Sequence, residues 1–488
     1  MKLKKLLKVI PEIIIKGSKE IEITGICSNS KIVSPGNLFI AKKGLTYDGA
    51  KYIPEAIEGG AIAILTDLYD PTYKDMTQLI TPDVNELEAI LAAEYHGNPS
   101  KSLTMIGITG TNGKTTVSYL VKNILDRVSG PTGLIGTVEY IIGEHKLPAT
   151  HTTPDVTLNH KLLHEMVLSG CKSAVMEVTS HALIQNRVSN IYFDVAVFTN
   201  LSQDHLDFHG TMEEYRKAKN LLFRNMRNGS CVINVDDPAH DEIMKGCSST
   251  VLTYGIEKEA DLRAENIVYA DHTTSFDLVI KTNRYLCKTP LPGKYNVYNC
   301  LAAFGVGLTQ QIPIEKLLEI AQTFPQVRGR LEQIPNETGT KIFVDFAHTE
   351  DALKNILLCL KEMPHRKIIT IFGCGGNRDK TKRPRMAKIA EQLSDVIIVT
   401  SDNPRNENPE DILDDIIAGF SGNTTFLREV DRKIAFEKAM EIAEPGDILL
   451  IAGKGHESGQ IFAHNTVEFN DALVIKEVCS NLLPQHSN

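Results

Sequence analysis

The sequence predicts an α/β protein of three domains: a small N-terminal α/β domain, a central doubly wound and mostly parallel sheet, and a C-terminal sheet of the same kind. Length is the first observation, because 488 residues correspond to about three domains at ~150 residues each. The second is the alternation of strand and helix patterns from residue 103 onward, which is typical of parallel sheets. The third is one stretch, residues 103–126, around which the chain is organised. We place the domains at residues 1–101, 102–328 and 329–488.

The stretch at residues 103–126 predicts a phosphate-binding loop. Thr104 to Thr109 is a short apolar, β-branched run typical of a buried strand, and apolar residues at helical spacing follow from Val117. The glycine turn between them lets backbone N–H groups surround a phosphate, and the helix N-terminus and a lysine add positive charge. Ile108 stands where the general pattern has its first glycine, so the loop is a short variant. The predicted phosphate-binding residues are Gly110, Thr111, Asn112, Gly113, Lys114, Thr115 and Thr116.

Composition and charge exclude several classes of protein. Hydrophobic residues make up 42% and charged residues 23%, an ordinary globular balance, and the net charge of -9 argues against a nucleic-acid partner. The nine cysteines form no CxxC pair, so neither a zinc cage nor a disulfide framework is indicated. No apolar run approaches the ~20 residues of a membrane span. Residues 1–17 lack the apolar core and cleavage site of a signal peptide. We therefore expect a cytoplasmic, reduced protein, and a monomer.

The first hundred residues predict a small α/β unit. Strand patterns cover residues 21–27, 36–42 and 61–66, and a short helix pattern covers residues 52–58. The polar segment from residue 96 to residue 102 is a break, which we take as the first domain boundary.

Residues 103 to about 328 alternate strands and helices. Beyond the phosphate loop we expect strands at 134–137, 173–178, 194–200 and 231–235, and helices at 156–169 and 212–226. Ligands of such sheets bind at the carboxyl ends of the strands. Glu177 and Asn200 lie at two such ends, and Lys114 lies just beyond a third.

Residues 329 to 488 predict a second doubly wound, Rossmann-like unit. We expect strands at 342–346, 367–372, 396–401 and 448–453, with helices at 351–362, 382–393, 409–419 and 432–443. The strand ends carry Asp345 and three polar or glycine-rich clusters, at 373–376, 402–405 and 453–457. Helix capping explains any one of these four features but explains all four poorly, so we expect them to converge.

The motifs along the chain resemble those of the Mur ligase superfamily. They are GITGTNGKTT at the phosphate loop, Glu177 in MEVTSHAL, His205 in FTNLSQDHLDFHG, Lys219 in EYRKAKNLL, Asn296 and Asn299 in LPGKYNVYNCLAA, Arg330 in RGRLE, and Asp345 and His348 in VDFAHTEDAL. TTPD at 152–155, SHAL at 180–183, GCGGNRDKTKRP at 373–384, DNPR at 402–405 and GKGHE at 453–457 look like the MurE type. The resemblance covers nearly the whole chain. It implies an ATP-dependent ligase of peptidoglycan synthesis that joins UDP-N-acetylmuramoyl-L-alanyl-D-glutamate to a diamino acid.

The resemblance also implies the chemistry of the reaction. The γ-phosphate of ATP passes to the D-glutamate γ-carboxylate, and the amine attacks the resulting acyl phosphate, so catalysis is mostly positioning and charge neutralisation. Lys114 would neutralise the phosphates, while Thr115 and Glu177 would hold one Mg²⁺. His205 and a carbamylated Lys219 would hold a second Mg²⁺. Without the resemblance, His205 would be interpreted as a capping or core histidine and Lys219 as a solvated helix residue.

The resemblance assigns the three domains to UDP-substrate, ATP and amino-acid binding, in chain order. Asn299, Arg330 and Asp345 would contact the nucleotide, with Asp345 at the ribose and Arg330 at a phosphate. The UDP-substrate residues would be Ser30, Thr152, Thr153, Thr179, Gln185 and Arg187, with Arg187 facing a substrate anion. As isolated residues they would be interpreted as helix caps or solvated loop positions.

The identity of the diamino acid depends on the DNPR motif. Meso-diaminopimelate carries one more carboxylate than lysine, and the planar fork of Arg405 can bind it bidentately. Similar lysine-adding enzymes lack this arginine, so we expect diaminopimelate and keep L-lysine as the alternative. Arg378, Gly453 and Glu457 would hold the other end of the amino acid, and Asp402, Asn403 and Pro404 complete the predicted set.

Two places depart from the family pattern, and two other functions stay open. Asn29 and Lys31 flank Ser30 where the uridine-contact region usually has Asp and Arg, and Phe346 and Glu350 replace Tyr and Pro. A folylpolyglutamate synthase would share the phosphate loop but would not be expected to carry DNPR, GKGHE or the N-terminal unit. A non-catalytic nucleotide-binding regulator is disfavoured by the presence of Glu177, His205, Lys219 and Asp345 together.

Overall fold

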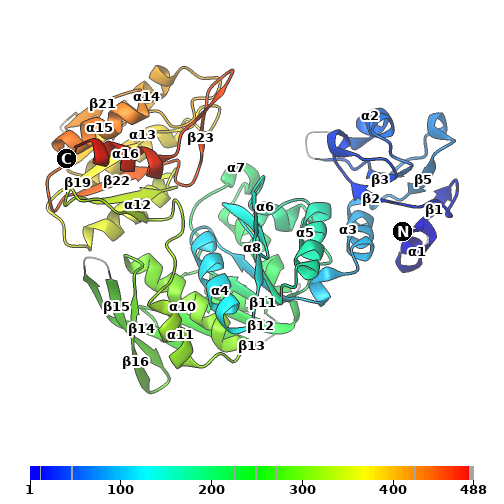
Figure 1. The fold of residues 1–488 in the computed structure, drawn as a ribbon, viewed down its shortest axis with the longest axis horizontal. Helices are drawn as coiled ribbons and strands as arrows, with labels where there is room; N and C mark the ends of the chain where they lie inside the picture. The colour runs from blue at the N-terminus through cyan, green and yellow to red at the C-terminus, as the bar shows by residue number, and fades with distance from the viewer. Residues whose placement is uncertain are drawn as a thin grey trace, which may run out of the picture. The chain divides into compact units, whose positions relative to one another are not determined.

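The computed structural model describes residues 1–10, 13–44, 48–224, 226–247, 250–270, 273–422 and 425–482. The chain divides into two compact units, which are described separately below. The first contains Met1–Gly110, Val121–Leu201 and His205–Leu252, and the second contains Thr111–Leu120, Ser202–Asp204 and Thr253–Asn488. Figure 1 shows the elements in chain order.

The N-terminal part of the first unit is built on a five-stranded sheet with the order β1-β5-β4-β3-β2. Its strands are parallel except β1, which runs antiparallel to β5. Leucines and isoleucines from the sheet pack against the short helix α1 and the long helix α3. The bounds are α1 Leu3–Leu6, β1 Ile14–Lys16, β2 Gly25–Cys27, β3 Asn37–Ile40, α2 Ile53–Glu58, β4 Ala63–Thr66, β5 Thr77–Ile80 and α3 Val84–Tyr95.

The rest of the first unit contains seven strands of an eleven-stranded sheet, in the order β12-β11-β6-β10-β7-β8-β9. The five strands from β12 to β7 are parallel, and β8 and β9 form an antiparallel extension. The bounds are β6 Thr104–Thr109, α4 Lys114–Val128, β7 Thr132–Ile135, β8 Glu139–Ile142, β9 His145–Pro148, α5 Val156–Leu168, β10 Ser173–Glu177, α6 Ser180–Ile184, β11 Phe193–Phe198, α7 Leu206–His209, α8 Met212–Arg224, β12 Met226–Asn234 and α9 His240–Met244. Alternate residues of the sheet bury against α5 and α8, as a doubly wound unit requires.

The second unit begins with the remaining strands of that sheet, in the order β16-β15-β14-β13. Strands β14, β15 and β16 form an antiparallel ribbon against which helices α10 and α11 pack. The bounds are β13 Thr250–Gly255, β14 Leu262–Ala270, β15 Thr273–Ile280, β16 Asn283–Thr289, α10 Lys294–Thr309 and α11 Ile314–Ala321.

A six-stranded sheet forms the C-terminal part of the second unit, in the order β17-β18-β22-β19-β20-β21. All its strands are parallel except β17. Two hydrophobic cores cover its two faces, one with α12, α13 and α14 and the other with α15 and α16. The bounds are β17 Glu332–Ile334, β18 Lys341–Asp345, α12 Glu350–Lys361, β19 Ile368–Phe372, α13 Lys382–Leu393, β20 Val396–Val399, α14 Pro409–Ile417, β21 Phe426–Arg428, α15 Arg432–Ile442, β22 Ile448–Ala452, β23 Gly459–Ile461, β24 Thr466–Glu468 and α16 Asp471–Leu482.

The predicted fold class is confirmed, and three element predictions need correction. The strand expected at 134–137 is β7, which ends at Ile135, so Thr137 lies in the turn after it. The strand expected at residues 21–27 is reduced to β2, because the backbone of Ile21 and Ile23 bonds instead to the chain start at Leu3 and Met1. The helix expected at 212–226 ends at Arg224, and Met226 already belongs to β12. The first glycine after the helix, Gly229, comes five residues past its end, so the sequence carried no stop signal at Arg224 itself.

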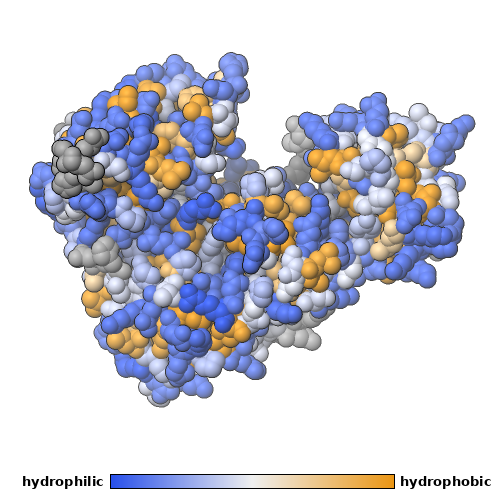
Figure 2. All heavy atoms as spheres, in the orientation of Figure 1, coloured by the Kyte–Doolittle hydropathy of each residue, from blue (hydrophilic) through white to orange (hydrophobic). Residues whose placement is uncertain are grey.

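The surface carries scattered rather than continuous apolar residues. On the face that Figure 2 shows, hydrophobic residues form small groups separated by hydrophilic ones. Large exposed side chains such as Leu68, Leu168 and Leu473 belong to different elements. Among the described residues, no helix is both long and apolar enough to cross a membrane.

Candidate active site

The phosphate loop has the geometry expected from its sequence. Strand β6 ends at Thr109 and helix α4 begins at Lys114. Gly110 has φ +149°, and a Cβ at this position would lie 1.8 Å from the Thr199 hydroxyl oxygen, so only glycine fits. The Lys114 ammonium donates to the Thr111 carbonyl over 2.9 Å, within the turn. The loop therefore places a cation and a helix N-terminus together, which is an anion-binding arrangement.

Thr115 and Arg330 meet in the second unit. The Arg330 Nη2 donates to the Thr115 hydroxyl over 3.3 Å, and its guanidinium lies 4.8 Å from the centre of the Phe346 ring. Arg330 is therefore positioned beside the first turn of α4, as a phosphate contact requires. Phe346, one of the departures from the family pattern, provides the surface on which this arginine stacks.

Asp345 and Asn299 are buried residues with contacts inside the protein. Asp345 accepts hydrogen bonds from the backbone N–H groups of Leu331 and Ala347, over 2.7 and 2.8 Å. Burial raises the pKa of this carboxyl, against the opposing charge of Arg330. Asn299 donates to the side chain of Asn296 over 3.0 Å. Asp345 thus holds the turn that carries Arg330, and a ribose contact by Asp345 stays a prediction.

Four threonines surround Glu177 at the end of β10, and we call Thr137, Thr152, Thr153 and Thr179 the hydroxyl cluster. Glu177 is fully buried and accepts from the Thr137 backbone N–H and hydroxyl, each over 2.9 Å. The Thr153 hydroxyl donates to the Glu177 carbonyl over 2.8 Å and lies 3.2 Å from the Thr179 hydroxyl. The Thr152 and Thr137 hydroxyls are 3.1 Å apart. The predicted residues Glu177, Thr152, Thr153 and Thr179 are therefore neighbours.

Arg187 belongs to the same neighbourhood, whereas Ser30 does not. Arg187 Nη1 donates to the Thr153 carbonyl over 2.9 Å, and burial lowers the pKa of this guanidinium. Gln185 caps the C-terminus of α6, which starts beside Thr179. Ser30 donates to the Glu55 carboxylate over 2.7 Å, and no hydrogen bond in the described ranges joins it to the hydroxyl cluster.

His205 and Lys219 lie against the ring of Tyr215. Lys219 is 1% exposed, and its ammonium lies 4.4 Å from the ring centre. His205 has φ +54°, and its ring centre lies 6.2 Å from that of Tyr215 and 4.7 Å from that of His181. Burial and the neighbouring histidines lower the pKa of His181 to about 4. The fold thus brings the two predicted metal-binding residues to one aromatic side chain.

These residues fit magnesium better than a metal bound by a full protein cage. No group of three or more His, Cys, Asp or Glu with metal-binding geometry occurs in the described part of the chain. Mg²⁺ in nucleotide sites usually takes one or two protein oxygens, with phosphates and water completing its shell. The Thr115 hydroxyl and the buried Glu177 carboxylate are donors of this kind.

The four strand-end features of the C-terminal sheet meet, as predicted. We call residues 373–380, 402–407 and 453–457 the amino-acid cluster. The Gly376 N–H donates to the Asn403 carbonyl over 2.9 Å, and the Gly453 N–H donates to the Asp345 carbonyl over 3.1 Å. They meet because β18, β22, β19 and β20 are adjacent and parallel, so their carboxyl ends lie at one edge.

Lys454 is the centre of this cluster. It is fully buried, and its ammonium donates to Asn403 Oδ1, Glu457 Oε2 and the Gly459 carbonyl over 3.0, 2.9 and 2.7 Å. Asn403 also donates to Glu457 Oε2 over 2.8 Å. Although burial alone would raise the pKa of Glu457, Lys454 and Asn403 lower it overall. Glu457 is thus held as a carboxylate.

A second buried cation supports the strand ends behind the cluster. Arg432 and Asp471 are both fully buried and joined by two hydrogen bonds of 2.8 and 2.7 Å. Arg432 also donates to the carbonyls of Ser401 and Ala452, the residues before the DNPR and GKGHE motifs. Burial raises the pKa of the adjacent Asp402, while Arg432 opposes the change.

Arg405 and Arg378 are the cations of this cluster that carry no internal charge partner. Arg405 Nη1 donates to the Gly376 carbonyl over 3.0 Å, and its backbone N–H donates to the Ile461 carbonyl. Arg378 is exposed. Within the described residues neither arginine has a carboxylate at ion-pair distance. Two such arginines and a fixed carboxylate in one cluster suit a zwitterionic, dicarboxylic ligand.

Sequence reasoning missed three residues that organise these sites: Thr137, Tyr215 and Lys454. Thr137 was placed in a strand, and its position opposite Glu177 follows only from the pairing of β7 with β10. Tyr215 has helical spacing with Leu222, and this spacing alone indicates no functional role. Lys454 lies inside the GKGHE motif, where a lysine between glycines on a buried strand end was the available signal.

Comparisons with known proteins agree with this arrangement. Residues 22–96 match the catalytic domain of the Mur ligase family, residues 108–307 match the Mur ligase middle domain, and residues 329–455 match the glutamate ligase domain of Mur ligases. The chain belongs to the Mur ligase family. It is therefore an ATP-dependent ligase that forms amide bonds.

Relatives of this Mur ligase share its whole length. The UDP-N-acetylmuramoyl-L-alanyl-D-glutamate–2,6-diaminopimelate ligase of Chlamydia felis is 43% identical over 468 residues, which are 94% of this chain and 95% of the relative. The ligase of the same name from Listeria monocytogenes is 41% identical over 480 residues, with 97% of each chain covered.

Solved structures support the same assignment. A structure of a UDP-N-acetylmuramoyl-L-alanyl-D-glutamate–2,6-diaminopimelate ligase superposes with a TM-score of 0.70 at 30% identity and covers 100% of both chains. The MurF ligase of Thermotoga maritima, solved with ADP, has a TM-score of 0.66 at 19% identity and covers 94% of this chain and 97% of its own. A folylpolyglutamate synthase of Mycobacterium tuberculosis shares the fold at 18% identity and a TM-score of 0.62, over 74% of this chain and 91% of its own.

Proposed function

We propose that this Mur ligase adds meso-diaminopimelate to UDP-N-acetylmuramoyl-L-alanyl-D-glutamate in peptidoglycan synthesis, consuming ATP. The observation that carries the proposal is the amino-acid cluster. It contains two arginines without a carboxylate partner in the described residues, Arg405 and Arg378, and one carboxylate, Glu457, which Lys454 holds in place. Two cations and one anion match the two carboxylates and an ammonium group of the amino acid. The relatives named for this reaction support the same substrate.

The phosphate loop would bind ATP and activate the substrate carboxylate. Lys114 and the first N–H groups of α4 face the phosphates, and Arg330 lies beside Thr115 to contact them. Asn299 and Asp345 are proposed for the rest of the nucleotide. Bound Mg²⁺, held by Thr115 and Glu177, supplies further neutralisation of phosphate charge. The residues thus stabilise charge as the γ-phosphate moves to the carboxylate, which becomes the acyl phosphate that the amine attacks.

The hydroxyl cluster would bind the dipeptide end of the UDP-substrate. Thr152, Thr153 and Thr179 offer short hydroxyl groups, and Arg187, tethered to Thr153 through one nitrogen, offers its remaining N–H groups to a carboxylate. Gln185 lies one residue past the end of α6. Ser30, in the N-terminal sheet region, is proposed for the uridine end.

Lys219 is proposed to act as a carbamate that helps hold a second Mg²⁺ together with His205. Full burial favours the neutral amine that carbamylation requires, because desolvation penalises the ammonium form. Lys219→Ala should lose phosphate release, and a short added carboxylic acid should restore part of it. Full activity in Lys219→Ala would refute the role.

The organisation of the protein is part of the proposal. We place a UDP-substrate domain at residues 1–101, an ATP domain at 102–328 and an amino-acid domain at 329–488, in a monomeric, cytoplasmic enzyme. Limited proteolysis should cut near residues 101 and 328, and light scattering should give the mass of one chain. Cuts inside the sheets, or a dimer mass, would contradict these points.

The test of the function is phosphate release from ATP, measured with UDP-muramoyl-dipeptide and either meso-diaminopimelate or L-lysine. A buried site built for a charged group rejects an analogue lacking it by ~10⁴-fold, so we expect strong preference for diaminopimelate. Arg405→Ala should lose this preference selectively. Comparable kcat/KM for both amino acids in the wild type would contradict the diaminopimelate assignment. Phosphate release that requires folate and glutamate instead of UDP-muramoyl-dipeptide would contradict the assignment to peptidoglycan synthesis.

A further inference from the structure

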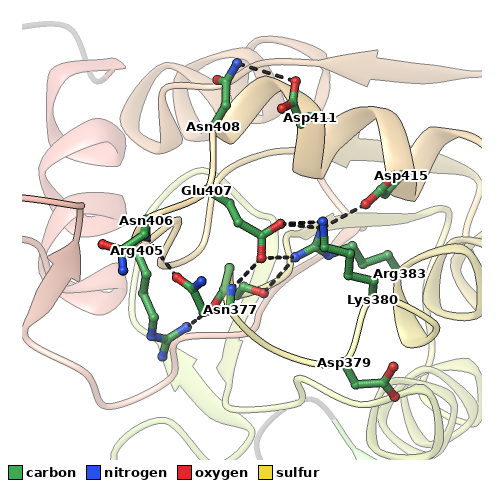
Figure 3. A network of polar contacts seen from close by, with 12 residues as sticks. Asn377, Asp379, Lys380, Arg383, Arg405, Asn406, Glu407, Asn408, Asp411 and Asp415 are labelled. Atoms are coloured by element: carbon green, nitrogen blue, oxygen red, sulfur yellow. Dashed lines mark hydrogen bonds and ion pairs between the residues drawn. The ribbon is translucent and has the colours of Figure 1, made fainter.

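Arg383, in helix α13, is a buried arginine outside the predicted diaminopimelate-binding set. Its side chain is fully buried, and burying a guanidinium is costly unless carboxylates neutralise it. Glu407 provides two hydrogen bonds, of 3.0 and 3.1 Å to the two terminal nitrogens, and Asp415 provides a third of 2.8 Å. Figure 3 shows Glu407 and Arg383 pointing toward one another, with Asp415 on the far side of the guanidinium. The two residues therefore form a bidentate ion pair with a fully buried guanidinium and a carboxylate that is 16% exposed.

Glu407 also joins the two loops of the amino-acid cluster that carry the arginines. It lies two residues after Arg405, and its carboxylate accepts from the backbone N–H of Asn377 and from the Lys380 ammonium. Asn377 precedes Arg378 in the other loop. One carboxylate thus touches the segment that carries Arg378 while belonging to the segment that carries Arg405 (Figure 3).

The same two loops are in close backbone contact around this carboxylate. The Asn406 N–H donates to Asn377 Oδ1 over 3.0 Å, and the Gly376 N–H donates to the Asn403 carbonyl over 2.9 Å. A Cβ on Gly376 would lie 1.8 Å from the Pro404 carbonyl oxygen, so the approach requires glycine. Small movements of one loop must therefore move the other.

Arg405 needs such support because its backbone is strained. Its φ of +54° is a left-handed conformation that a non-glycine residue adopts at a cost, and surrounding contacts must fix it. The Arg405 guanidinium donates to the Gly376 carbonyl in the other loop, and its backbone N–H donates to the Ile461 carbonyl. The Glu407 N–H donates to the Pro404 carbonyl and so closes the turn that contains Arg405. Release of Glu407 would let Arg405 relax and move its guanidinium.

We propose that Glu407, held by Arg383, is a positioning residue that fixes Arg405 and thereby sets the enzyme's preference for an amino acid with a second carboxylate. This rests on the proposed function, since it requires Arg405 to bind that carboxylate. Asp415 distinguishes positioning from simple stabilisation. It neutralises the same arginine, but none of its contacts in the described residues reaches either loop.

The test compares three single substitutions in the full-length enzyme. Glu407→Gln keeps the shape of the side chain and removes its charge. Asp415→Asn removes the other carboxylate on Arg383, and Glu410→Gln removes an exposed carboxylate three residues further on, which pairs with Arg428. Steady-state kinetics with meso-diaminopimelate and with high concentrations of L-lysine, and thermal unfolding, are measured for each.

Glu407→Gln should lower kcat/KM for diaminopimelate by ~10²-fold, the effect of a misplacement of about 1 Å, mainly through KM. The values for L-lysine, ATP and the UDP-substrate should stay unchanged, because none of them depends on Arg405. Asp415→Asn should lower the unfolding temperature without changing the preference, and Glu410→Gln should change neither.

Three results would overturn the proposal. One is an unchanged preference in Glu407→Gln, and another is an equal loss for diaminopimelate and L-lysine. The third is the same change of preference in Asp415→Asn. If Glu407→Gln fails to fold, Arg383→Lys, which keeps the charge but breaks the bidentate geometry, takes its place with the same expected loss of preference. Failure of the wild type to use diaminopimelate would instead refute the proposed function.

Discussion

The hydroxyl cluster and the amino-acid cluster are each organised by one buried residue with three hydrogen bonds. In the first, Thr153 bonds to the Glu177 carbonyl and to the hydroxyl and N–H of Thr179. In the second, Lys454 bonds to Asn403, Glu457 and the Gly459 carbonyl. One central group is a neutral hydroxyl and the other is an ammonium.

The difference sets how each region responds to change. A neutral buried hydrogen bond contributes about 1 kcal/mol net, whereas removing one partner of a buried ion pair costs about 3–5 kcal/mol because the other charge is left uncompensated. A single substitution should therefore cost more free energy of unfolding in the amino-acid cluster than in the hydroxyl cluster. The first unit and the amino-acid cluster also differ in how their stability depends on pH.

The largest effect is expected for Lys454→Met. The free energy of unfolding should fall by about 3 kcal/mol, because Asn403 Oδ1 and the Gly459 carbonyl lose a charged donor and the partly exposed Glu457 loses its ammonium partner. Urea denaturation measures the fall, and the KM for diaminopimelate should rise with it. Lys433→Met is the matched control, since Lys433 forms an exposed pair with Glu477 and should cost less than about 1 kcal/mol. Equal losses of unfolding free energy in Lys454→Met and Lys433→Met would contradict the special role of the buried ammonium in the amino-acid cluster.

A smaller effect is expected from pH in the first unit. His160 is fully buried, its Nε2 lies 3.1 Å from the Ser189 carbonyl, and burial lowers its pKa from 6.5 to about 4. The unfolded chain therefore binds a proton below pH 6.5 that the folded chain refuses until about pH 4, so stability falls as pH drops through this window. At ~1.4 kcal/mol per pKa unit, the loss between pH 7.5 and 5 is about 2 kcal/mol.

His160→Gln should remove this part of the pH dependence in urea denaturation, while the exposed His145→Gln should leave it unchanged. The amino-acid cluster differs, because Arg383 lowers the pKa of Glu407 from 4.5 to about 2. Its contribution is present above pH 4.5 and is lost as pH falls toward 2. The same dependence of unfolding free energy on pH in His160→Gln and the wild type would contradict the assignment of the loss above pH 5 to His160.

The smallest effect is expected for Thr153→Val, which keeps the shape and removes the hydroxyl. Loss of its hydrogen bonds should cost about 1–2 kcal/mol in urea denaturation and should raise the KM of the UDP-substrate but not that of diaminopimelate. Thr152→Val is the comparison variant, since Thr152 is less buried. A cost as large as that of Lys454→Met would show that charge is not what separates the two clusters.

Sequence patterns predicted the parallel cores better than the antiparallel additions. The strands around Glu177 and Asp345 were found because buried parallel strands are continuous apolar runs bounded by polar residues. The β14–β16 ribbon was missed, because charged and polar residues interrupt β14 and β16 and neither connecting turn contains glycine or proline. Pairing partners, and hence the Thr137–Glu177 contact, depend on tertiary structure.

Site residues could be predicted where a single short motif carries the function. They could not be predicted where residues from separate motifs contact one another only in the folded protein. Lys114 and Arg405 lie in short patterns whose chemistry can be interpreted locally. Glu407, Arg383 and Lys454 act across loops that are far apart in the chain, and their charges alone would suggest solvated residues. Burial decides their role, and burial follows from the sheet order rather than from neighbours in sequence.

The strand order β18-β22-β19 determines when the C-terminal sheet can fold during synthesis of the chain. Strand β22, which ends at Ala452, lies between β18 and β19, which are both synthesised earlier, and it pairs with both. Until the ribosome has released this segment, β18 and β19 have no common partner, and the loop with Lys454 does not exist. A chain truncated before residue 448 would therefore lack the middle of its last sheet rather than an end. The amino-acid cluster is therefore completed only after its central strand has been synthesised.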